Sequence, residues 1–431
     1  MPVRLDNSSA DFAAGFATFL ATKREVAADI EAATRRIVDD VAARGDAALL
    51  EATAKFDRLD LTADQLRVTS DEIDAAAKAC DTATIDALKF ARDRIEVFHQ
   101  RQMPKDERFT DALGVELGWR WSAIEAVGLY VPGGTAAYPS SVLMNAVPAR
   151  VAGVPRVVMV VPSPDGKLNP LVLAAAQLGG VSEIYRVGGA QAVAALAHGT
   201  ATIAPVAKIV GPGNAYVAAA KRQVFGKVGI DMIAGPSEVL VIADDTGNPD
   251  WIAADLLAQA EHDANAQAIL ITDSADLAEQ VVRAVESQLM TLSRATIARA
   301  SWQTYGAIIH VKNIADSVAL ADAIAAEHLE IITADCDALA AKIRNAGAIF
   351  LGSHTPEAIG DYVGGSNHVL PTARSARFSS GLGVLDFMKR TSILKCGPDQ
   401  LRALAPAAMT LGKAEGLDAH ARSVGIRLNL Q

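Results

Sequence analysis

From about residue 126 onward, short apolar runs alternate with glycine- or proline-containing turns and alanine-rich segments of helical length. Residues 127–131 run into Pro132-Gly133-Gly134, and residues 208–210 run into Gly211-Pro212-Gly213. Repeated strand–turn–helix units of this kind are typical of a parallel sheet covered by helices. A second such series begins near residue 235, with strands expected at 239–243, 268–272, 307–311, 330–333 and 348–351. The sequence therefore predicts an α/β fold with two Rossmann-like layers.

The chain length and the changes in the spacing of apolar residues predict several domains. At 431 residues the chain is too long for one ordinary hydrophobic core. Residues 1–120 carry apolar positions at helical spacing, which predicts a helical N-terminal region. We expect one Rossmann-like domain at 121–235 and a second at 236–387. Residues 388–431 no longer alternate between strand and helix patterns, so they are expected to form an arm or a small extra domain with its own helix near 407–422.

The glycine turns at the ends of the expected strands could bind the phosphates of a nucleotide. Glycine lets the backbone approach phosphate closely, and the following helix offers free N–H groups and a positive dipole end. None of the turns completes the pattern G-x-G-x-x-G, because Gly211-Pro212-Gly213 continues as Asn214-Ala215-Tyr216. We also find no clear acidic residue at the distance expected for a ribose hydroxyl. Tight turns alone explain these glycines equally well, so the turns permit a nucleotide site without demonstrating one.

Two polar residues continue an apolar stripe in the helix expected at 249–262. Gln259 follows the stripe of Ile252 and Leu256, and His262 stands three residues further on, on the same side. Buried polar groups are costly unless they find partners, so this pair is a candidate for metal binding. An amide is an unusual metal ligand, however, and a hydrogen-bonded core histidine is the simpler interpretation.

A second polar pair lies at the end of the helix expected at 314–327. His328 falls on its apolar stripe, with Glu327 beside it. A helix C-terminus raises the pKa of a histidine and apolar burial lowers it, so the value is tunable near neutrality. That suits a general base, and the adjacent carboxylate could serve a second proton transfer or activate water. A capping histidine beside a solvated glutamate is the simpler alternative.

Two more candidates lie further along the chain. Asp361 stands in a glycine-rich loop after the strand expected at 348–351, and His420 stands in the tail helix. Together with Gln259 and His262 they would form a nitrogen- and oxygen-rich set that suits a zinc-like metal. Taken alone, each is explained as well by an ordinary turn aspartate or surface histidine, and the sequence does not show that the four converge.

Composition excludes several classes of protein. The net charge is −10 and there is no dense cluster of Lys and Arg, which argues against a nucleic-acid partner. No apolar run approaches the roughly 18 residues that a membrane span requires, and the first 24 residues lack the apolar core of a signal peptide. The cysteines Cys80, Cys336 and Cys396 are far apart and predict neither a disulfide framework nor a thiolate metal site. We therefore expect a cytoplasmic protein.

Several sequence blocks, in this order, resemble the histidinol dehydrogenase family over essentially the whole chain. The blocks are Gly128-Leu-Tyr-Val-Pro-Gly-Gly134, Gly211-Pro-Gly-Asn-Ala-Tyr-Val217, Ile233-Ala-Gly-Pro-Ser-Glu-Val239, Gln259-Ala-Glu-His-Asp263, Glu327-His-Leu-Glu330 and Asn367-His-Val-Leu-Pro-Thr372. The resemblance implies NAD-dependent oxidation of L-histidinol, through L-histidinaldehyde, to L-histidine. It also implies incomplete Rossmann-like domains, so the missing glycine fingerprint does not argue against NAD.

The resemblance also implies a role for each candidate residue. One zinc ion per subunit would hold the substrate through its imidazole and amino groups, with four ligands: Gln259, His262, Asp361 and His420. Glu327 and His328 would be the acid/base pair, and His328 would also contact substrate. Further substrate contacts would come from Ser237 and Glu415, and NAD contacts from Tyr130, Gln191 and Asn214. Family members are homodimers whose tail crosses over, so His420 would complete the partner's site.

Two alternatives remain beside this interpretation. A paralogous zinc- and NAD-dependent dehydrogenase could oxidise another alcohol, such as a sulfonated diol, but Glu415 and His420 suit a substrate with an amine and an imidazole. A non-catalytic nucleotide-binding or regulatory protein is the second. It would have no physical need for Glu327, His328 and the four ligand candidates at otherwise apolar positions.

Overall fold

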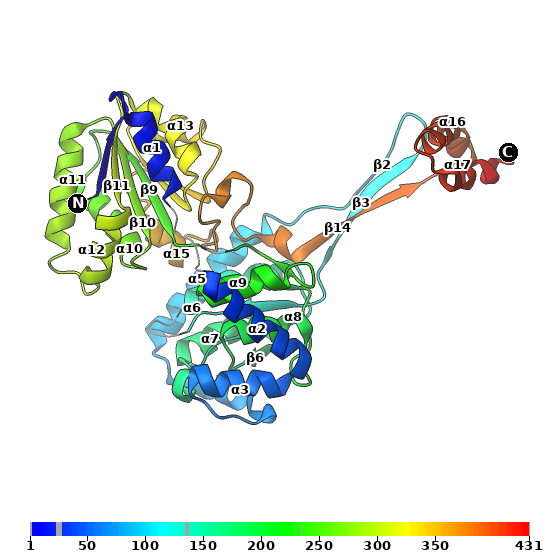
Figure 1. The fold of residues 1–431 in the computed structure, drawn as a ribbon, viewed down its shortest axis with the longest axis horizontal. Helices are drawn as coiled ribbons and strands as arrows, with labels where there is room; N and C mark the ends of the chain where they lie inside the picture. Colours follow the sequence, from blue (N-terminus) through cyan, green and yellow to red (C-terminus); the bar gives the residue numbers. More distant parts are fainter. Residues whose placement is uncertain (1, 23–27, 134–137, 234, 431) are drawn as a thin grey trace. The chain divides into compact units, whose positions relative to one another are not determined.

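The computed structural model describes residues 2–22, 28–133, 138–233 and 235–430 and divides into two compact units. The first comprises Met1–Gln102 and Glu125–Phe387, and the second comprises Met103–Ile124 and Met388–Gln431 (Figure 1). Gly134 and Ala234, which belong to two of the sequence blocks above, lie outside the described residues. Within the described ranges, no helix is both long enough and apolar enough to cross a membrane.

A five-stranded parallel sheet forms the first α/β layer of the first unit. Its strand order is β6 (Glu183–Tyr185), β5 (Val157–Val160), β4 (Val127–Tyr130), β7 (Lys208–Val210) and β8 (Gly229–Ile230). The connecting helices are α6 (Pro139–Val151), α7 (Pro170–Gly179), α8 (Gly189–His198) and α9 (Ala215–Val224). Helices α2 (Ala28–Arg44) and α3 (Asp46–Asp57) pack on α8, while α4 (Ser70–Ala79) and α5 (Thr82–Gln100) pack on α7. Much of the N-terminal region thus covers this layer.

A six-stranded parallel sheet forms the second layer. Its strand order is β1 (Val3–Asp6), β11 (Ala307–His310), β10 (Gln267–Thr272), β9 (Glu238–Ala243), β12 (His328–Ile332) and β13 (Ala348–Leu351). The helices of this part are α1 (Phe12–Ala21), α10 (Pro249–Ala260), α11 (Ala275–Gln288), α12 (Ala295–Tyr305), α13 (Ser317–Ile324), α14 (Cys336–Ala340) and α15 (Glu357–Tyr362). Strands β9, β10 and β12 are buried along their whole length, as expected of central parallel strands. The predicted α/β fold with parallel sheets is confirmed.

The N-terminal region differs from the expected helical region at 1–120. It is helical in its middle, but Val3–Asp6 forms the edge strand β1, in register with β11 from Val3 beside Ala307. Leu5 packs against the core of the second layer together with Phe12 and Phe16. A four-residue strand is too short to be detected by periodicity, and its pairing partner lies about 300 residues away. The domain boundaries expected near 120 and 235 stay predictions.

Two helices end earlier than their apolar stripes predict, and both corrections concern the candidate site. Helix α13 ends at Ile324 because Ala325 adopts a left-handed conformation with φ of 49°, so His328 begins strand β12. The prediction that His328 lies at a helix C-terminus is therefore wrong. Residues 328–332 pair with β9 and β13 at once, and their Leu and Ile side chains favour a strand. Helix α10 ends at Ala260, so His262 lies in the turn that follows it.

The second unit is built on an antiparallel sheet with strand order β14–β3–β2. Strands β3 (Glu116–Ala123) and β14 (Met388–Lys395) pair over eight residues, and β2 (Glu107–Thr110) flanks β3. The tail then forms two helices, α16 (Pro398–Ala414) and α17 (Asp418–Gly425), which pack on each other. The single helix expected near 407–422 is thus replaced by two, separated by the turn at Gly416, where φ is 70°.

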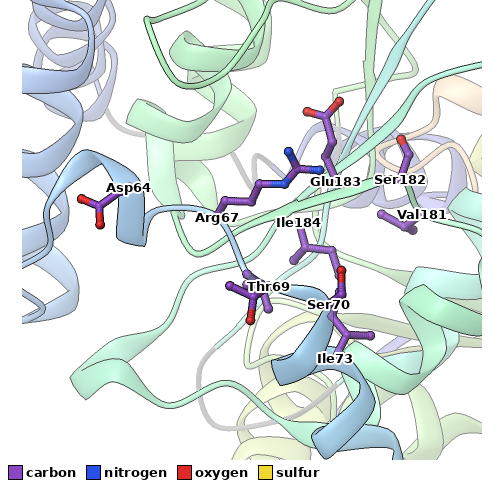
Figure 2. A pocket seen from close by; sticks show the side chains of 10 residues that line it. Asp64, Arg67, Thr69, Ser70, Ile73, Val181, Ser182, Glu183 and Ile184 are labelled. Atoms are coloured by element: carbon purple, nitrogen blue, oxygen red, sulfur yellow. The ribbon is translucent and has the colours of Figure 1, made fainter.

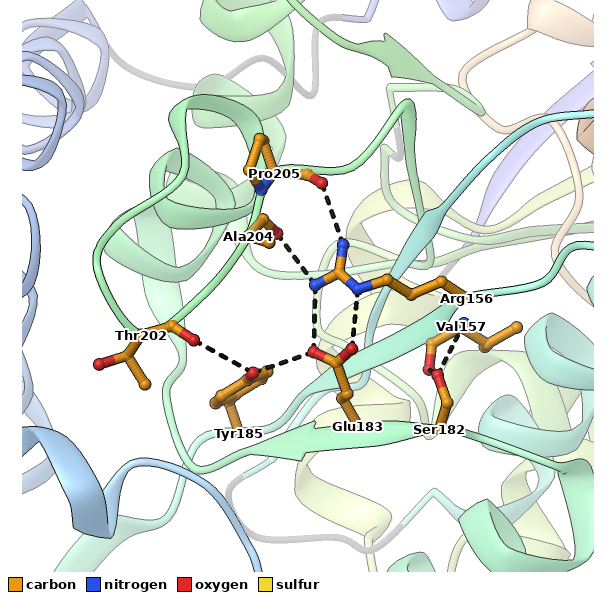
Figure 3. A network of polar contacts seen from close by, with 8 residues as sticks. All are labelled: Arg156, Val157, Ser182, Glu183, Tyr185, Thr202, Ala204 and Pro205. Carbon is orange, nitrogen blue, oxygen red and sulfur yellow. Dashed lines mark hydrogen bonds and ion pairs between the residues drawn. The ribbon is translucent and has the colours of Figure 1, made fainter.

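A partly buried ion-pair network ties the edge strand β6 of the first layer to its neighbour β5 (Figure 3). Arg156, just before β5, donates two hydrogen bonds to Glu183 in β6, at 2.8 and 3.0 Å. Arg156 also donates to the carbonyls of Ala204 and Pro205, and the Tyr185 hydroxyl donates to Glu183 at 2.9 Å. Its hydrogen bonds with Arg156 hold the pKa of Glu183 below the ordinary value of 4.5.

Glu183→Gln should lower the free energy of unfolding by about 1–3 kcal/mol at neutral pH, because it leaves Arg156 without its charged partner. A carboxylate whose pKa is lowered by folding stabilises the protein above its unfolded pKa of 4.5 and loses that effect as the pH falls through the lower folded pKa. Urea denaturation of both proteins should therefore show a gap at pH 7 that closes in acid. An equal gap at both pH values would contradict the ion-pair explanation.

Candidate active site

His328 is buried at the start of β12, with only 5% of its surface exposed. Its Nδ1 lies 3.1 Å from the backbone carbonyl oxygen of Glu238. A carbonyl can only accept, so Nδ1 carries the hydrogen and Nε2 of the neutral ring carries the lone pair. Nε2 is buried without a hydrogen-bond partner among the described residues, 3.9 Å from Oδ1 of Asp361. The ring therefore presents a free basic nitrogen.

Burial favours the neutral form of both members of the expected acid/base pair. It lowers the pKa of His328, although the nearby Asp361 carboxylate opposes this. Burial raises the pKa of Glu327 well above its ordinary value, and the carboxyl groups of Glu238 and Asp361 add to the effect. Glu327 accepts a hydrogen bond from the backbone N–H of Glu238 at 3.1 Å and another from the side chain of Ser237. A neutral imidazole can accept a proton, and a carboxyl group that keeps its proton can donate one, so the two side chains suit opposite proton transfers.

Three of the four expected zinc ligands lie in the first unit. Gln259 is in the last turn of α10, only 1% exposed, and its amide oxygen and nitrogen are both buried with no hydrogen-bond partner in the described chain. Asp361 lies in the short helix α15 rather than in the expected loop, because residues 357–362 follow Pro356 into a helical turn. His262 is exposed. Burial lowers the pKa of His328 and His368, and His262 is close enough to both to add to this effect.

These donors fit a zinc ion. An orphaned amide buried this deeply needs a partner, and a metal bound at its oxygen would supply one. In the part of the chain that the structure describes, no three His, Cys, Asp or Glu side chains are grouped closely enough to hold a metal. The expected set contains only His262 and Asp361 from these residue types within the first unit, since Gln259 is an amide and His420 lies in the second unit. A nitrogen- and oxygen-rich set of this kind is one that zinc accepts.

The sequence analysis missed two polar residues beside this cluster. His368 lies with Nδ1 3.0 Å from the backbone carbonyl of Asp361 and Nε2 3.1 Å from the Ser141 hydroxyl. Glu357, the first residue of α15, is 2% exposed and has Oε2 3.5 Å from Nδ1 of His328. His368 belongs to one of the sequence blocks, so it could have been proposed; Glu357 lies in no pattern that would single it out.

The three expected NAD residues all follow the carboxyl ends of strands in the first layer. Tyr130 ends β4, and its hydroxyl accepts a hydrogen bond from the backbone N–H of Gly189 at 2.9 Å. Gln191 is buried in α8, after β6. Asn214 caps α9, after β7, through hydrogen bonds from two backbone N–H groups at 3.0 and 3.2 Å. The carboxyl edge of a parallel sheet is where α/β proteins bind nucleotides.

A buried ion pair fixes the glycine turn before Asn214. Lys221 of α9 and Asp231 after β8 form the pair, and Lys221 also donates to the carbonyl of Gly211 at 3.0 Å. Asp231 accepts from the N–H of Gly211 at 2.8 Å. Gly211 has a φ of 108°, and a Cβ there would lie 2.2 Å from the carbonyl oxygen of Tyr130. Only glycine fits, so this turn has a defined shape next to one expected NAD residue.

The remaining substrate candidates divide between the two units. Ser237 precedes β9 in the first unit and hydrogen-bonds Glu327. Glu415, at the C-terminus of α16, and His420, in α17, belong to the second unit, and both side chains are exposed.

A cavity of about 330 Å³ lies away from all these residues (Figure 2). It is bounded by the segment around α4 and by the residues that lead into β6, with Arg67, Thr69 and Glu183 among its polar residues. None of the expected site residues lines it. We assign it no part in the chemistry.

The comparisons with known proteins agree with the sequence blocks. A family model described as histidinol dehydrogenase matches residues 20–428. The histidinol dehydrogenase of Bradyrhizobium diazoefficiens is 83% identical over 430 residues, covering 100% of both chains, and that of Agrobacterium fabrum is 70% identical over 429 residues, covering 100% of this chain and 99% of the relative. The crystal structure of histidinol dehydrogenase from Elizabethkingia anophelis matches with a TM-score of 0.94 at 37% identity, covering 99% of this chain and 98% of that one. The family resemblance is thus confirmed, and the chain belongs to the histidinol dehydrogenase family.

Proposed function

We propose that this enzyme oxidises L-histidinol to L-histidine through L-histidinaldehyde in the cytoplasm, with one zinc ion per subunit and NAD as the oxidant of both steps. The family catalyses the final steps of histidine biosynthesis. The balanced reaction consumes one histidinol, one water and two NAD⁺ and yields histidine, two NADH and three protons. The observation that supports the assignment of residues is the buried imidazole of His328, whose free Nε2 lies near Asp361 and whose Nδ1 lies near Glu327.

His328 is proposed as the base. Its Nδ1 is bound to the carbonyl of Glu238, so Nε2 is the atom that accepts the alcohol proton as hydride leaves the adjacent carbon. Glu327 then assists the addition of water to the aldehyde, and the resulting hydrate loses a second hydride. Ser237, through its hydrogen bond to Glu327, and Glu415 would help to hold the substrate. Burial keeps bulk water from competing for these protons.

Gln259, His262, Asp361 and His420 would hold the zinc ion, and Tyr130, Gln191 and Asn214 would contact NAD. When bound, zinc supplies a fixed attachment point for the imidazole and amino nitrogens of the substrate, and NAD supplies the hydride acceptor. The orphaned amide of Gln259 supports the first assignment. The common position of the other three residues at one sheet edge supports the second.

The second unit is proposed to cross to the partner subunit of a homodimer. Glu415 and His420 are exposed on α16 and α17, which follow the long β3–β14 ladder. Several large apolar side chains of this unit are also exposed, among them Leu394, Leu411 and Ile426. An arm with an exposed apolar surface and two unburied ligand candidates suits a site completed by a second copy.

Gln259→Leu tests the metal site without measuring turnover. In zinc-free protein the substitution should leave Tm unchanged or raise it, because it replaces two orphaned buried polar atoms by an apolar group of similar size. In wild type, added zinc should raise Tm through binding to the folded state, and the variant should lose most of that rise. Differential scanning calorimetry with and without zinc gives both readings.

Gln267→Leu is the matched control, since Gln267 is equally buried but donates to the carbonyl of Tyr305 at 3.1 Å. It should lower Tm and keep the full zinc response. A normal zinc response in Gln259→Leu would contradict the proposed ligand.

Hybrid dimers test the shared site. One subunit carries His420→Ala and the other carries Glu327→Gln with His328→Asn, so each homodimer is inactive. If the arm crosses, one of the two sites in each heterodimer has all its parts, and random mixing should restore about a quarter of wild-type activity. Heterodimers isolated with two affinity tags and shown to be inactive would contradict the crossing.

A further inference from the structure

We propose that Glu357 is a positioning residue for His328, held in place by a buried carboxyl pair, Glu330 and Asp255, which joins the three elements that carry the acid/base and metal-ligand candidates. The proposal rests on the proposed function of His328 as the base. It concerns side chains that do not themselves touch substrate.

Glu357 lies behind the imidazole ring. Its Oε2 is 3.5 Å from Nδ1 of His328 and is buried with no hydrogen-bond partner in the described part of the chain. The carbonyl of Glu238 lies 3.1 Å from the same nitrogen and accepts its hydrogen bond, while Oε2 of Glu357 lies beside that bond without forming a second one. An oxygen atom this close to Nδ1 favours a hydrogen over a lone pair on that nitrogen and restricts rotation of the ring. Nε2 is then kept free on the side of Asp361.

Glu357 is itself held by Glu330 and Asp255. The backbone N–H of Glu357 donates to Oε1 of Glu330 at 2.7 Å, and the Glu330 side chain hydrogen-bonds to that of Asp255. Two carboxyl groups can hydrogen-bond only if one of them keeps a proton. Burial provides this, since it raises the pKa of both Glu330 and Asp255 above their ordinary values.

Each of the three carboxyl residues lies on the same side of its helix or strand as a candidate site residue, either one helical turn or two strand residues away. Asp255 precedes Gln259 by one turn of α10. Glu330 follows His328 by two residues of β12, on the same face of the strand, and Glu357 precedes Asp361 by one turn of α15. The hydrogen bond from the Glu357 N–H to Glu330, together with the one between the Glu330 and Asp255 side chains, therefore sets the spacing of the amide, the base and the aspartate.

Stability alone does not account for three buried carboxyl groups. Burying them is costly, and apolar side chains of similar volume generally stabilise a core at least as well. Their placement on the three site-bearing elements, with one oxygen aimed at the catalytic ring, points to preorganisation of the site.

The test compares Glu357→Leu with Glu357→Gln in the zinc-supplied enzyme. Leucine removes the acceptor behind His328, so kcat should fall by about 30-fold or more while KM for histidinol and for NAD changes by less than about threefold. Glutamine keeps a neutral acceptor and should restore at least about a third of kcat. Glu183→Leu, which removes a carboxyl group from the other sheet, should leave kcat unchanged. A Glu357→Leu variant with kcat within about twofold of wild type would overturn the proposal, as would a glutamine variant as slow as the leucine variant.

A second measurement separates this proposal from the role of His328 as base. Nitrogen-15 NMR of histidine-labelled enzyme reports which ring nitrogen carries the hydrogen, and His328→Asn identifies the signal. We expect hydrogen on Nδ1 of His328 in wild type and in Glu357→Gln, and a clear loss of that tautomer in Glu357→Leu. Normal turnover by His328→Asn would refute the role of His328 as the base, but not the effect of Glu357 on its tautomer. An unchanged tautomer in Glu357→Leu would refute the positioning role.

Discussion

The candidate site depends on the parallel pairing of β12 with β9 on one side and β13 on the other. This pairing buries His328 at the first residue of the strand and brings its Nδ1 to the carbonyl of Glu238, the first residue of β9. That hydrogen bond favours hydrogen on Nδ1, and the tautomer decides which nitrogen can act as a base. The same strand pairing brings the N–H of Glu238 to Glu327, on the same edge of the sheet.

The two layers contribute opposite edges of their sheets. In the first layer, the NAD candidates lie at the carboxyl ends of β4, β6 and β7, the edge where α/β folds usually bind nucleotides. In the second layer, Ser237, Glu327 and His328 lie at the amino ends of β9 and β12. Helix α10 connects the parallel strands β9 and β10, so it runs from the carboxyl edge of the sheet back to the amino edge. Its last turn therefore brings Gln259 to the amino edge as well. The candidate residues of the second layer therefore lie at the edge opposite to the one where parallel sheets usually bind ligands. Glu357 and Asp361 of the short helix α15 lie beside His328 at this amino edge.

The sequence could predict most strands of both layers, because buried parallel strands are continuous apolar runs followed by glycine turns. The two-residue strand β8 is too short to give such a pattern. It could not predict where the helix before His328 ends, since the stripe of α13 continues in sequence past the left-handed Ala325. Strand β1 and the β3–β14 ladder depend on pairing between distant segments, which local patterns do not encode. Residue patterns made Glu327, Gln259 and Asp361 candidates beside simpler alternatives, and the family resemblance implied their roles. Glu357 and the Glu330–Asp255 pair are visible only once three elements are brought together.

We propose that one site, built around the buried His328, oxidises the same substrate twice with the help of zinc. The number of NADH molecules formed per L-histidinol can be measured for the purified enzyme supplied with zinc, after chelation, and after zinc is restored. We expect close to two NADH per histidinol, loss of the reaction on chelation and its return with zinc. A folded, zinc-loaded dimer that forms one NADH per histidinol, or none, would contradict it.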